Sequence, residues 1–99
     1  MKQHITKEQW NELTNIEQQR LCDIIKINYT DFNHQRNTEG YLSERLNIGG
    51  MIEFLGYNFN DIVRDFKNGQ GFLVGVDGTM TKGEELVDAL WEAVKYKLK

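Results

Sequence analysis

The chain has no proline, one cysteine and two histidines among its 99 residues, and it contains no long apolar run. A single cysteine cannot form a disulfide within the chain, so we expect a hydrophobic core to supply the stability and the compartment to be reducing. No segment approaches the roughly 20 apolar residues that cross a bilayer, and the first residues lack the apolar stretch of a signal peptide. These absences predict a single small globular domain over residues 1–99, located in the cytoplasm.

Residues that bind metals or act as nucleophiles are equally scarce. Cys22, His4 and His34 are scattered along the sequence without the short paired spacings of a zinc site. Cys22 stands between Leu21 and Asp23, which is not the electropositive setting that activates a thiolate. No Gly-x-Ser-x-Gly motif is present. The sequence therefore predicts no metal, no cofactor and no enzymatic activity.

Basic charge is not in excess in either half of the chain. Twelve Lys and Arg residues oppose 15 Asp and Glu residues, for a formal net charge of −3. A nucleic-acid interface needs a surplus of basic side chains to neutralise phosphates. The balance disfavours a nucleic-acid partner, and the absence of a spanning segment disfavours a membrane.

Helix-start signals occur twice near the N-terminus. Thr6 with Gln9, and Thr14 with Glu17, have the spacing of capping boxes. They predict either one long helix from Lys7 to about residue 27, or a short helix and a longer one with a bend near residues 13 and 14; we favour the bend.

The second of these helices carries an apolar stripe and a polar face. The apolar residues recur at helical intervals and predict the core side, at Ile16, Leu21, Ile24 and Ile25. Residues 17–19, all Glu or Gln, are expected to form a solvated face opposite the stripe.

A polar segment follows over residues 28–40 and has no apolar period. Its many Asn, Asp and Thr side chains compete for backbone hydrogen bonds, which is typical of a loop. Tyr29 and Phe32 are expected to pin its beginning, and the loop is either mobile or a functional surface.

Two more helices are predicted in the middle of the chain. Asn47 can cap a helix that Gly56 ends, with Leu46 and Met51 as a hydrophobic staple. Asn58 or Asn60 can then cap another helix, through residues 62–66. Their succession over residues 48–66 has the coarse spacing of a helix-turn-helix.

The last third of the sequence predicts a β-hairpin followed by a helix. Residues 72–76 are apolar and β-rich, Asp77-Gly78 favours a type I′ turn, and residues 79–81 return as the partner strand. Two strands alone are marginally stable, so the hairpin is expected either to pack against a helix or to gain a third strand, for which residues 27–30 are a candidate. Thr81 with Glu84 forms a third capping box, and it precedes a strong helical stripe at Leu86, Leu90, Ala93, Val94 and Leu98. The fold class is thus α+β, mostly helical, with a short antiparallel hairpin before the C-terminal helix.

Two adjacent glycines, Gly49 and Gly50, fall in the first turn of a predicted helix, where free N–H groups can receive an anion. They lack the Lys-Ser/Thr of a P-loop and the preceding strand of a dinucleotide-binding motif. Close helix packing is the interpretation that we favour, and a weak anion or small-ligand site is the alternative.

Eleven aromatic residues are more than a core of this size requires. Phe54, Tyr57 and Phe59 crowd around one turn, where a helical stripe can bury only some of them. Exposed aromatic rings are frequent anchors of protein interfaces. We predict an interaction surface at this corner and at the start of the 28–40 loop, comprising Phe54, Tyr57, Phe59, Tyr29 and Phe32.

Segments 47–55 and 85–95 resemble small uncharacterised proteins encoded by phages and prophages of Gram-positive bacteria, and residues 5–14 are similar in character. These segments cover about a third of the chain and contain helix-packing residues only. The resemblance implies an accessory role in which the protein binds and redirects a host protein, such as a defence component.

The sequence thus supports three functional hypotheses. The first is a non-enzymatic protein-interaction module of phage type that acts on a host protein. The alternatives are a helix-turn-helix DNA-binding regulator and a small-ligand or nucleotide-binding protein.

Overall fold

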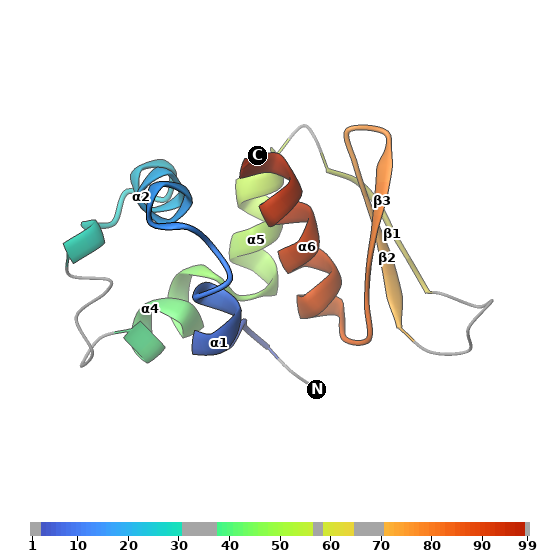
Figure 1. Ribbon diagram of the computed structural model, residues 1–99. Helices are drawn as coiled ribbons and strands as arrows, with labels where there is room; N and C mark the ends of the chain where they lie inside the picture. The colour runs from blue at the N-terminus through green and yellow to red at the C-terminus, as the bar shows by residue number, and fades with distance from the viewer. Residues whose placement is uncertain (1–2, 31–37, 57–58, 65–70, 99) are drawn as a thin grey trace.

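The computed structural model describes residues 3–30, 38–56, 59–64 and 71–98 of the chain (Figure 1). A three-stranded antiparallel sheet lies on one side of the C-terminal helix, and the other helices lie on its opposite side (Figure 1). This arrangement confirms the α+β fold with a hairpin before the C-terminal helix. The elements are α1 (Lys7–Trp10), α2 (Asn15–Ile24), α4 (Thr38–Arg45), α5 (Ile48–Leu55), β1 (Phe59–Arg64), β2 (Phe72–Val76), β3 (Thr79–Gly83) and α6 (Leu86–Leu98).

Both N-terminal capping boxes form, so the predicted bend between two helices is confirmed. The backbone N–H of Gln9 donates to Thr6 Oγ1 at 3.1 Å, and the N–H of Thr6 donates to Gln9 Oε1 at 2.9 Å. Thr14 and Glu17 make the same reciprocal pair at 3.2 and 2.9 Å. Each box satisfies two orphan donors at a helix start, which fixes the beginnings of α1 and α2.

The buried face of α2 differs from the predicted one. Gln18, expected in solvent, is buried beside Leu21 and Cys22, whereas Ile16 and Ile24, expected in the core, are 70% and 53% exposed. The amide of Gln18 is satisfied, because it donates to the carbonyl of Trp10 at 3.1 Å and accepts from the Tyr29 hydroxyl at 3.1 Å. Because its amide is satisfied, Gln18 can lie in the core, and the buried face of α2 includes Gln18 rather than Ile16 and Ile24.

The chain between α2 and α5 was predicted as a polar loop over residues 28–40. Residues 31–37, including Phe32 and His34, lie outside the described part, and α4 begins at Thr38. The predicted helix after Asn47 is confirmed as α5: Asn47 Oδ1 accepts from the N–H of Gly50 at 2.7 Å, and Gly56 ends the helix with φ 53°.

Residues 59–64, which were predicted to lie in a helix, form strand β1 instead. Ile62 pairs with Val74 of β2, so these residues supply a third strand for the hairpin. Residues 27–30, the predicted source of that strand, are not in the sheet. Strand pairing with β2 outweighs the local helix signals of this segment. The helix-turn-helix prediction for residues 48–66 is therefore wrong.

The hairpin forms as predicted, but the start of the last helix does not. Asp77 and Gly78 have φ values of 52° and 79°, as a type I′ turn requires. Thr81 is a residue of β3 rather than an N-cap, and its hydroxyl donates to the carbonyl of Ala89 at 2.8 Å. The predicted capping box of Thr81 and Glu84 is therefore wrong, and α6 begins at Leu86.

The core surrounds α6, which packs against β2 and β3 on one side and against α5 and α2 on the other. The predicted stripe of α6 is confirmed at Leu90, Ala93, Val94 and Leu98, which are buried, while Leu86 is half-buried. Trp91 is also buried and joins Trp10 of α1 in the same cluster. No helix in the described ranges is long and apolar enough to cross a membrane.

Candidate functional site

The structure describes the side chains of two of the five predicted surface aromatics. Phe54 is half-buried on α5, and the Lys97 ammonium lies 5.7 Å from the centre of its ring. Tyr29 is half-buried, and its hydroxyl donates to the buried Gln18. Tyr57 and Phe32 lie outside the described residues, and Phe59 is the first residue of β1. The contact of Tyr29 with Gln18 indicates a packing role for that ring.

A groove of about 490 Å³ opens beside Phe54, between the end of α2, the end of α4 and one face of α5. We call it the helical groove; its lining residues are Ile24, Ile25, Lys26, Glu44, Arg45, Gly50, Glu53 and Phe54. Two of these residues are basic (Lys26 and Arg45) and two are acidic (Glu44 and Glu53), so their formal charges cancel. Its apolar part is formed by the two isoleucines and the phenylalanine.

The end of α2 positions the exposed isoleucine of the helical groove. The N–H of Lys26 donates to the carbonyl of Asp23 at 3.3 Å, and the N–H of Ile27 donates to the carbonyl of Cys22 at 2.9 Å. This is the bonding pattern of a Schellman motif, with Lys26 in the left-handed position at φ 61°. The reversal places Ile24 and Lys26 together at the rim of the groove, next to the end of α4.

The two glycines of α5 are in different environments. A Cβ on Gly50 would lie 2.1 Å from the carbonyl oxygen of Arg45, whereas a Cβ on Gly49 would make only an ordinary contact, 3.8 Å from Asn47 Oδ1. The N–H of Gly50 already donates to Asn47, and the facing carbonyl would repel an anion. Gly50 is thus explained by the close approach of α4 to α5.

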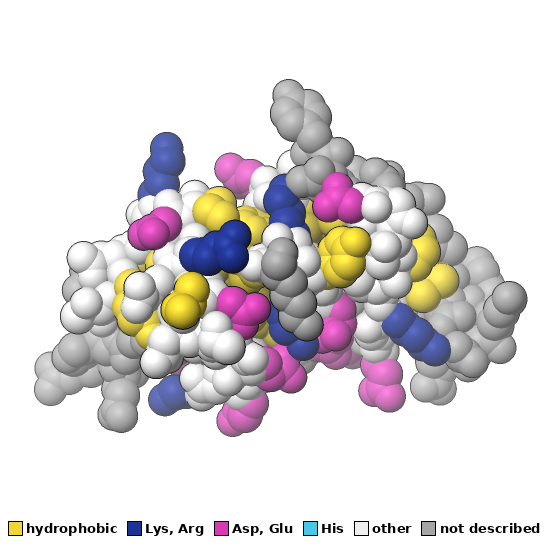
Figure 2. All heavy atoms as spheres, turned by 45° about the horizontal axis from the view of Figure 1, so that its top comes forward, with side chains coloured by type: hydrophobic (Ala, Val, Ile, Leu, Met, Phe, Trp, Pro, Cys, Tyr) yellow, Lys and Arg dark blue, Asp and Glu magenta, His cyan; other side chains and the backbone are white. Residues whose placement is uncertain are grey.

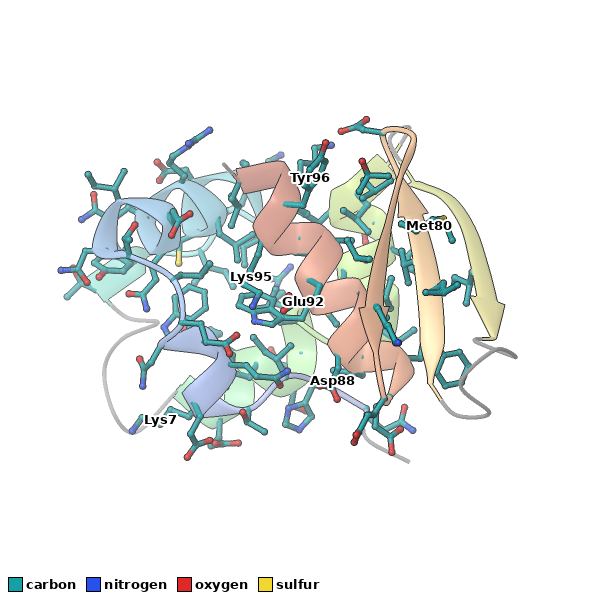
Figure 3. The ribbon with its side chains drawn as sticks, turned by 45° about the vertical axis from the view of Figure 1, so that its right-hand side comes forward. Lys7, Met80, Asp88, Glu92, Lys95 and Tyr96 are labelled. Atoms are coloured by element: carbon teal, nitrogen blue, oxygen red, sulfur yellow. The ribbon has the colours of Figure 1, made fainter. Side chains whose placement is uncertain are left out.

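A second groove, of about 510 Å³, lies between the α1–α2 connection and β3, over the exposed strip of α6. We call it the β3 groove; its lining residues are Glu12, Leu13, Glu17, Thr81, Lys82, Glu92, Lys95 and Tyr96. Figure 3 shows Asp88, Glu92, Lys95 and Tyr96 following one another along α6 beside β3. Tyr96 is 44% exposed at the end of this strip.

A hydrogen-bond network crosses the β3 groove. Glu12 Oε1 accepts from the buried indole N–H of Trp91 and from the Lys95 ammonium, both at 2.9 Å, and Lys95 also forms an ion pair with Glu92. Burial raises the pKa of Glu12, but the hydrogen bonds from Lys95 and Trp91 outweigh it and hold this pKa below its usual value. Burial lowers the pKa of Lys95, but its bonds to Glu92 and Glu12 raise it above the usual value. The network therefore favours charged forms and ties the α1–α2 connection to α6.

The other candidate chemical groups have structural roles. Cys22 is buried, and burial together with the nearby Asp23 charge raises the pKa of its thiol to about 11, so it stays protonated at neutral pH. His4 is half-buried and pairs with Asn47 in an isolated β-bridge. Within the described ranges, no group of three or more His, Cys, Asp and Glu residues could hold a metal ion.

Large apolar side chains stand exposed among charged ones. On the face seen in Figure 2, hydrophobic side chains emerge between acidic and basic ones. The large hydrophobic residues with the greatest exposure in the described ranges are Ile16, Ile24, Met80 and Tyr96. The exposure of Ile24 was not predicted, because the apolar residues of α2 were expected to form its core face. The spacing of Gln18, Leu21, Cys22 and Ile25 is an equally regular helical stripe.

Comparisons of the chain with models of protein families, with curated proteins and with solved structures gave no significant match. The two grooves and the exposed side chains are therefore the features that bear on function.

Proposed function

We propose that this chain is a non-enzymatic protein-interaction module that binds a host protein through the helical groove. The observation that carries the proposal is the exposure of Ile24, which is 53% exposed and lines a groove that also contains Phe54. Burying the exposed part of an isoleucine stabilises a complex by about 1 kcal/mol. Apolar anchors surrounded by charged residues are typical of interface centres with a polar rim.

The charges of the helical groove define the kind of partner. Lys26 and Arg45 are balanced by Glu44 and Glu53, so the groove has no basic surplus for phosphate groups. The balance favours a protein surface that presents an apolar side chain between polar ones.

The biological setting of the proposal comes from the resemblance of segments 47–55 and 85–95 to small phage proteins. A phage-type accessory factor acts in the cytoplasm of the host cell, and its partner would be a host protein such as a defence component. Modulation or inhibition of that protein is the role that we propose.

Ile24 and Ile16 offer a matched pair of variants to test this function. Both are exposed isoleucines on α2, but only Ile24 lines the helical groove. A tagged chain should capture one host protein, and the complex should form again from the two purified proteins. We expect Ile24→Ser to weaken binding about fivefold by calorimetry, Ile16→Ser to leave it unchanged, and both variants to keep the wild-type circular dichroism.

Two results would contradict the proposal at different levels. Wild-type affinity of the Ile24→Ser chain would show that the helical groove is the wrong surface. Tyr57→Ala and Phe59→Ala, measured in the same way, then test the corner at residues 54–59. Failure of every captured protein to bind as a purified partner would reject the interaction function itself.

A further inference from the structure

Four exposed charged side chains surround the apolar part of the helical groove. Lys26 and Arg45 are basic, and Glu44 and Glu53 are acidic. In the part of the chain that the structure describes, none of these four side chains forms an ion pair or a hydrogen bond, whereas Lys95 of the β3 groove is paired. Such charges attract a ligand that presents the opposite signs and repel one that presents the same signs. Their positions therefore indicate what can bind in the groove.

The basic and the acidic charges lie on different walls of the helical groove. Lys26 lies just after α2, which forms one wall, and Glu53 lies on α5, which forms the other. Glu44 and Arg45 end α4, which runs below α2 toward the start of α5 (Figure 1). One wall thus carries a base, the other an acid, and the segment between them carries one charge of each sign.

This arrangement of charges is complementary to itself about a two-fold axis. When two copies of one surface meet across such an axis, residue i of each copy contacts residue j of the other. Each wall of the groove then faces the opposite wall of the second copy, so Lys26 faces Glu53 twice. Glu44 and Arg45, between the walls, can pair with the same two residues of the second copy. No like charges are opposed in this arrangement.

The apolar residues of the helical groove fit the same two-fold contact. Ile24 is 53% exposed on the α2 wall, and Phe54 is half-buried on the α5 wall. The contact of opposite walls brings Ile24 of each copy against Phe54 of the other. Eight residues line the groove, which is fewer than the roughly 20 to 30 on each side of a stable interface. A dimer formed here should therefore be weak and depend on protein concentration.

We propose that the helical groove binds a second copy of this chain in a weak two-fold dimer. Reciprocal pairing of Lys26 with Glu53, and of Arg45 with Glu44, surrounds the apolar contact of Ile24. The inference concerns the surface through which we propose host-protein binding, but it stands without that function. Because the dimer covers the groove, a host protein that binds there must displace the second copy, and its apparent affinity should fall as the chain is concentrated.

A charge exchange tests the pairing between copies. In the acidic chain, Lys26→Glu and Arg45→Glu make all four charges negative; in the basic chain, Glu44→Lys and Glu53→Lys make all four positive. We expect the full-length wild type to show a monomer–dimer equilibrium in sedimentation between about 10 µM and about 1 mM. Each variant alone should stay monomeric because like charges repel. An equimolar mixture of the two should form a heterodimer at least as tight as the wild-type dimer.

Isoleucine variants test the two-fold symmetry without a change of charge. An Ile24→Ser dimer lacks both isoleucines, so the roughly fivefold loss expected for one of them becomes a loss of about 25-fold in the dimer affinity. Ile16→Ser, the matched control outside the groove, should dimerise as the wild type does. Circular dichroism checks that each variant is folded.

Any of four results would overturn the inference. They are a wild type that stays monomeric at about 1 mM, a folded acidic or basic chain that dimerises as the wild type does, a mixture of the two that does not associate, and an Ile24→Ser chain with an undiminished dimer. Calorimetry with a purified host protein tests the proposed function separately. Ile24-dependent binding of that protein by a chain that never dimerises would support the function and reject the dimer.

Discussion

At the scale of single residues, Glu12 is the side chain with the most consequential contacts. It accepts hydrogen bonds from the indole of Trp91, which is buried, and from Lys95, although it is itself about half exposed. A buried donor left without its acceptor costs free energy, whereas an exposed ion pair contributes little. Glu12 and Glu92 therefore differ in importance, although both pair with the same lysine.

Removing the Glu12 carboxylate should lower the free energy of unfolding. We expect Glu12→Ala to cost about 1 kcal/mol, because the Trp91 N–H loses its acceptor and gains at best a water molecule. Glu92→Ala, the matched control, should change stability by less than about 0.5 kcal/mol. Urea unfolding monitored by circular dichroism measures both, and equal losses would show that the indole bond contributes nothing.

The stability that Glu12 contributes should depend on pH in the acidic range. Its pKa in the folded chain lies below the usual value of 4.5, so folding is favoured by the charged form. The contribution is complete above that value and is lost as the pH falls through the folded pKa. The difference between wild type and Glu12→Ala should therefore be constant near neutrality and shrink below about pH 4.5. A difference that grows in acid would contradict the assigned direction.

At the scale of elements, the junction of α4 and α5 is set by one glycine. The Arg45 carbonyl of α4 occupies the space where a side chain at position 50 would begin, and position 49 is open. A side chain therefore fits at position 49 but not at position 50, as expected if Gly50 is required for close helix packing.

Alanine substitutions at the two glycines should have effects of opposite sign. Gly50→Ala should destabilise the chain by about 2 kcal/mol or more, because its Cβ would overlap backbone atoms of Arg45. Gly49→Ala should stabilise it by about 0.5 to 1 kcal/mol, since alanine is the better helix former. Thermal unfolding gives both values, and equal effects would contradict the placement of α4 against α5.

The elements also show where local sequence is decisive and where it is not. Thr6, Thr14 and Asn47 were predicted as N-caps and are confirmed, because a cap involves residues three positions apart. Thr81 matched the same pattern but lies in β3, where its hydroxyl reaches Ala89. The pattern cannot distinguish the two cases, since strand pairing involves residues that the pattern does not include.

At the scale of the whole molecule, one hydrophobic cluster contains side chains from the N-terminal helices and from the C-terminal helix. Trp10 near the N-terminus and Trp91 in α6 are buried in the same cluster of apolar side chains. Gln9 of α1 also donates to Asp88 of α6 at 2.8 Å. The helical layer should therefore not unfold separately from α6 and the sheet that packs on it.

We expect unfolding to be a single cooperative transition reported equally by both tryptophans. In the Trp10→Phe chain Trp91 is the only tryptophan, and in the Trp91→Phe chain Trp10 is, so tryptophan emission reports one site in each variant. Within each variant, the urea midpoint from fluorescence should equal the midpoint from far-ultraviolet circular dichroism. Separate midpoints would show that the N-terminal helices and the α6–sheet unit are independent.

The sequence by itself determined the elements whose signals are short-range: the caps of α1, α2 and α5, the Asp77-Gly78 turn and the apolar stripe of α6. Only the tertiary structure decided that β1 is a strand, because its partner β2 lies across a connection that no local pattern spans. It also decided that Gln18 is buried and Ile24 exposed, because Trp10 and Tyr29 satisfy the amide. Both candidate grooves follow from such long-range contacts, since their walls come from segments distant in the sequence.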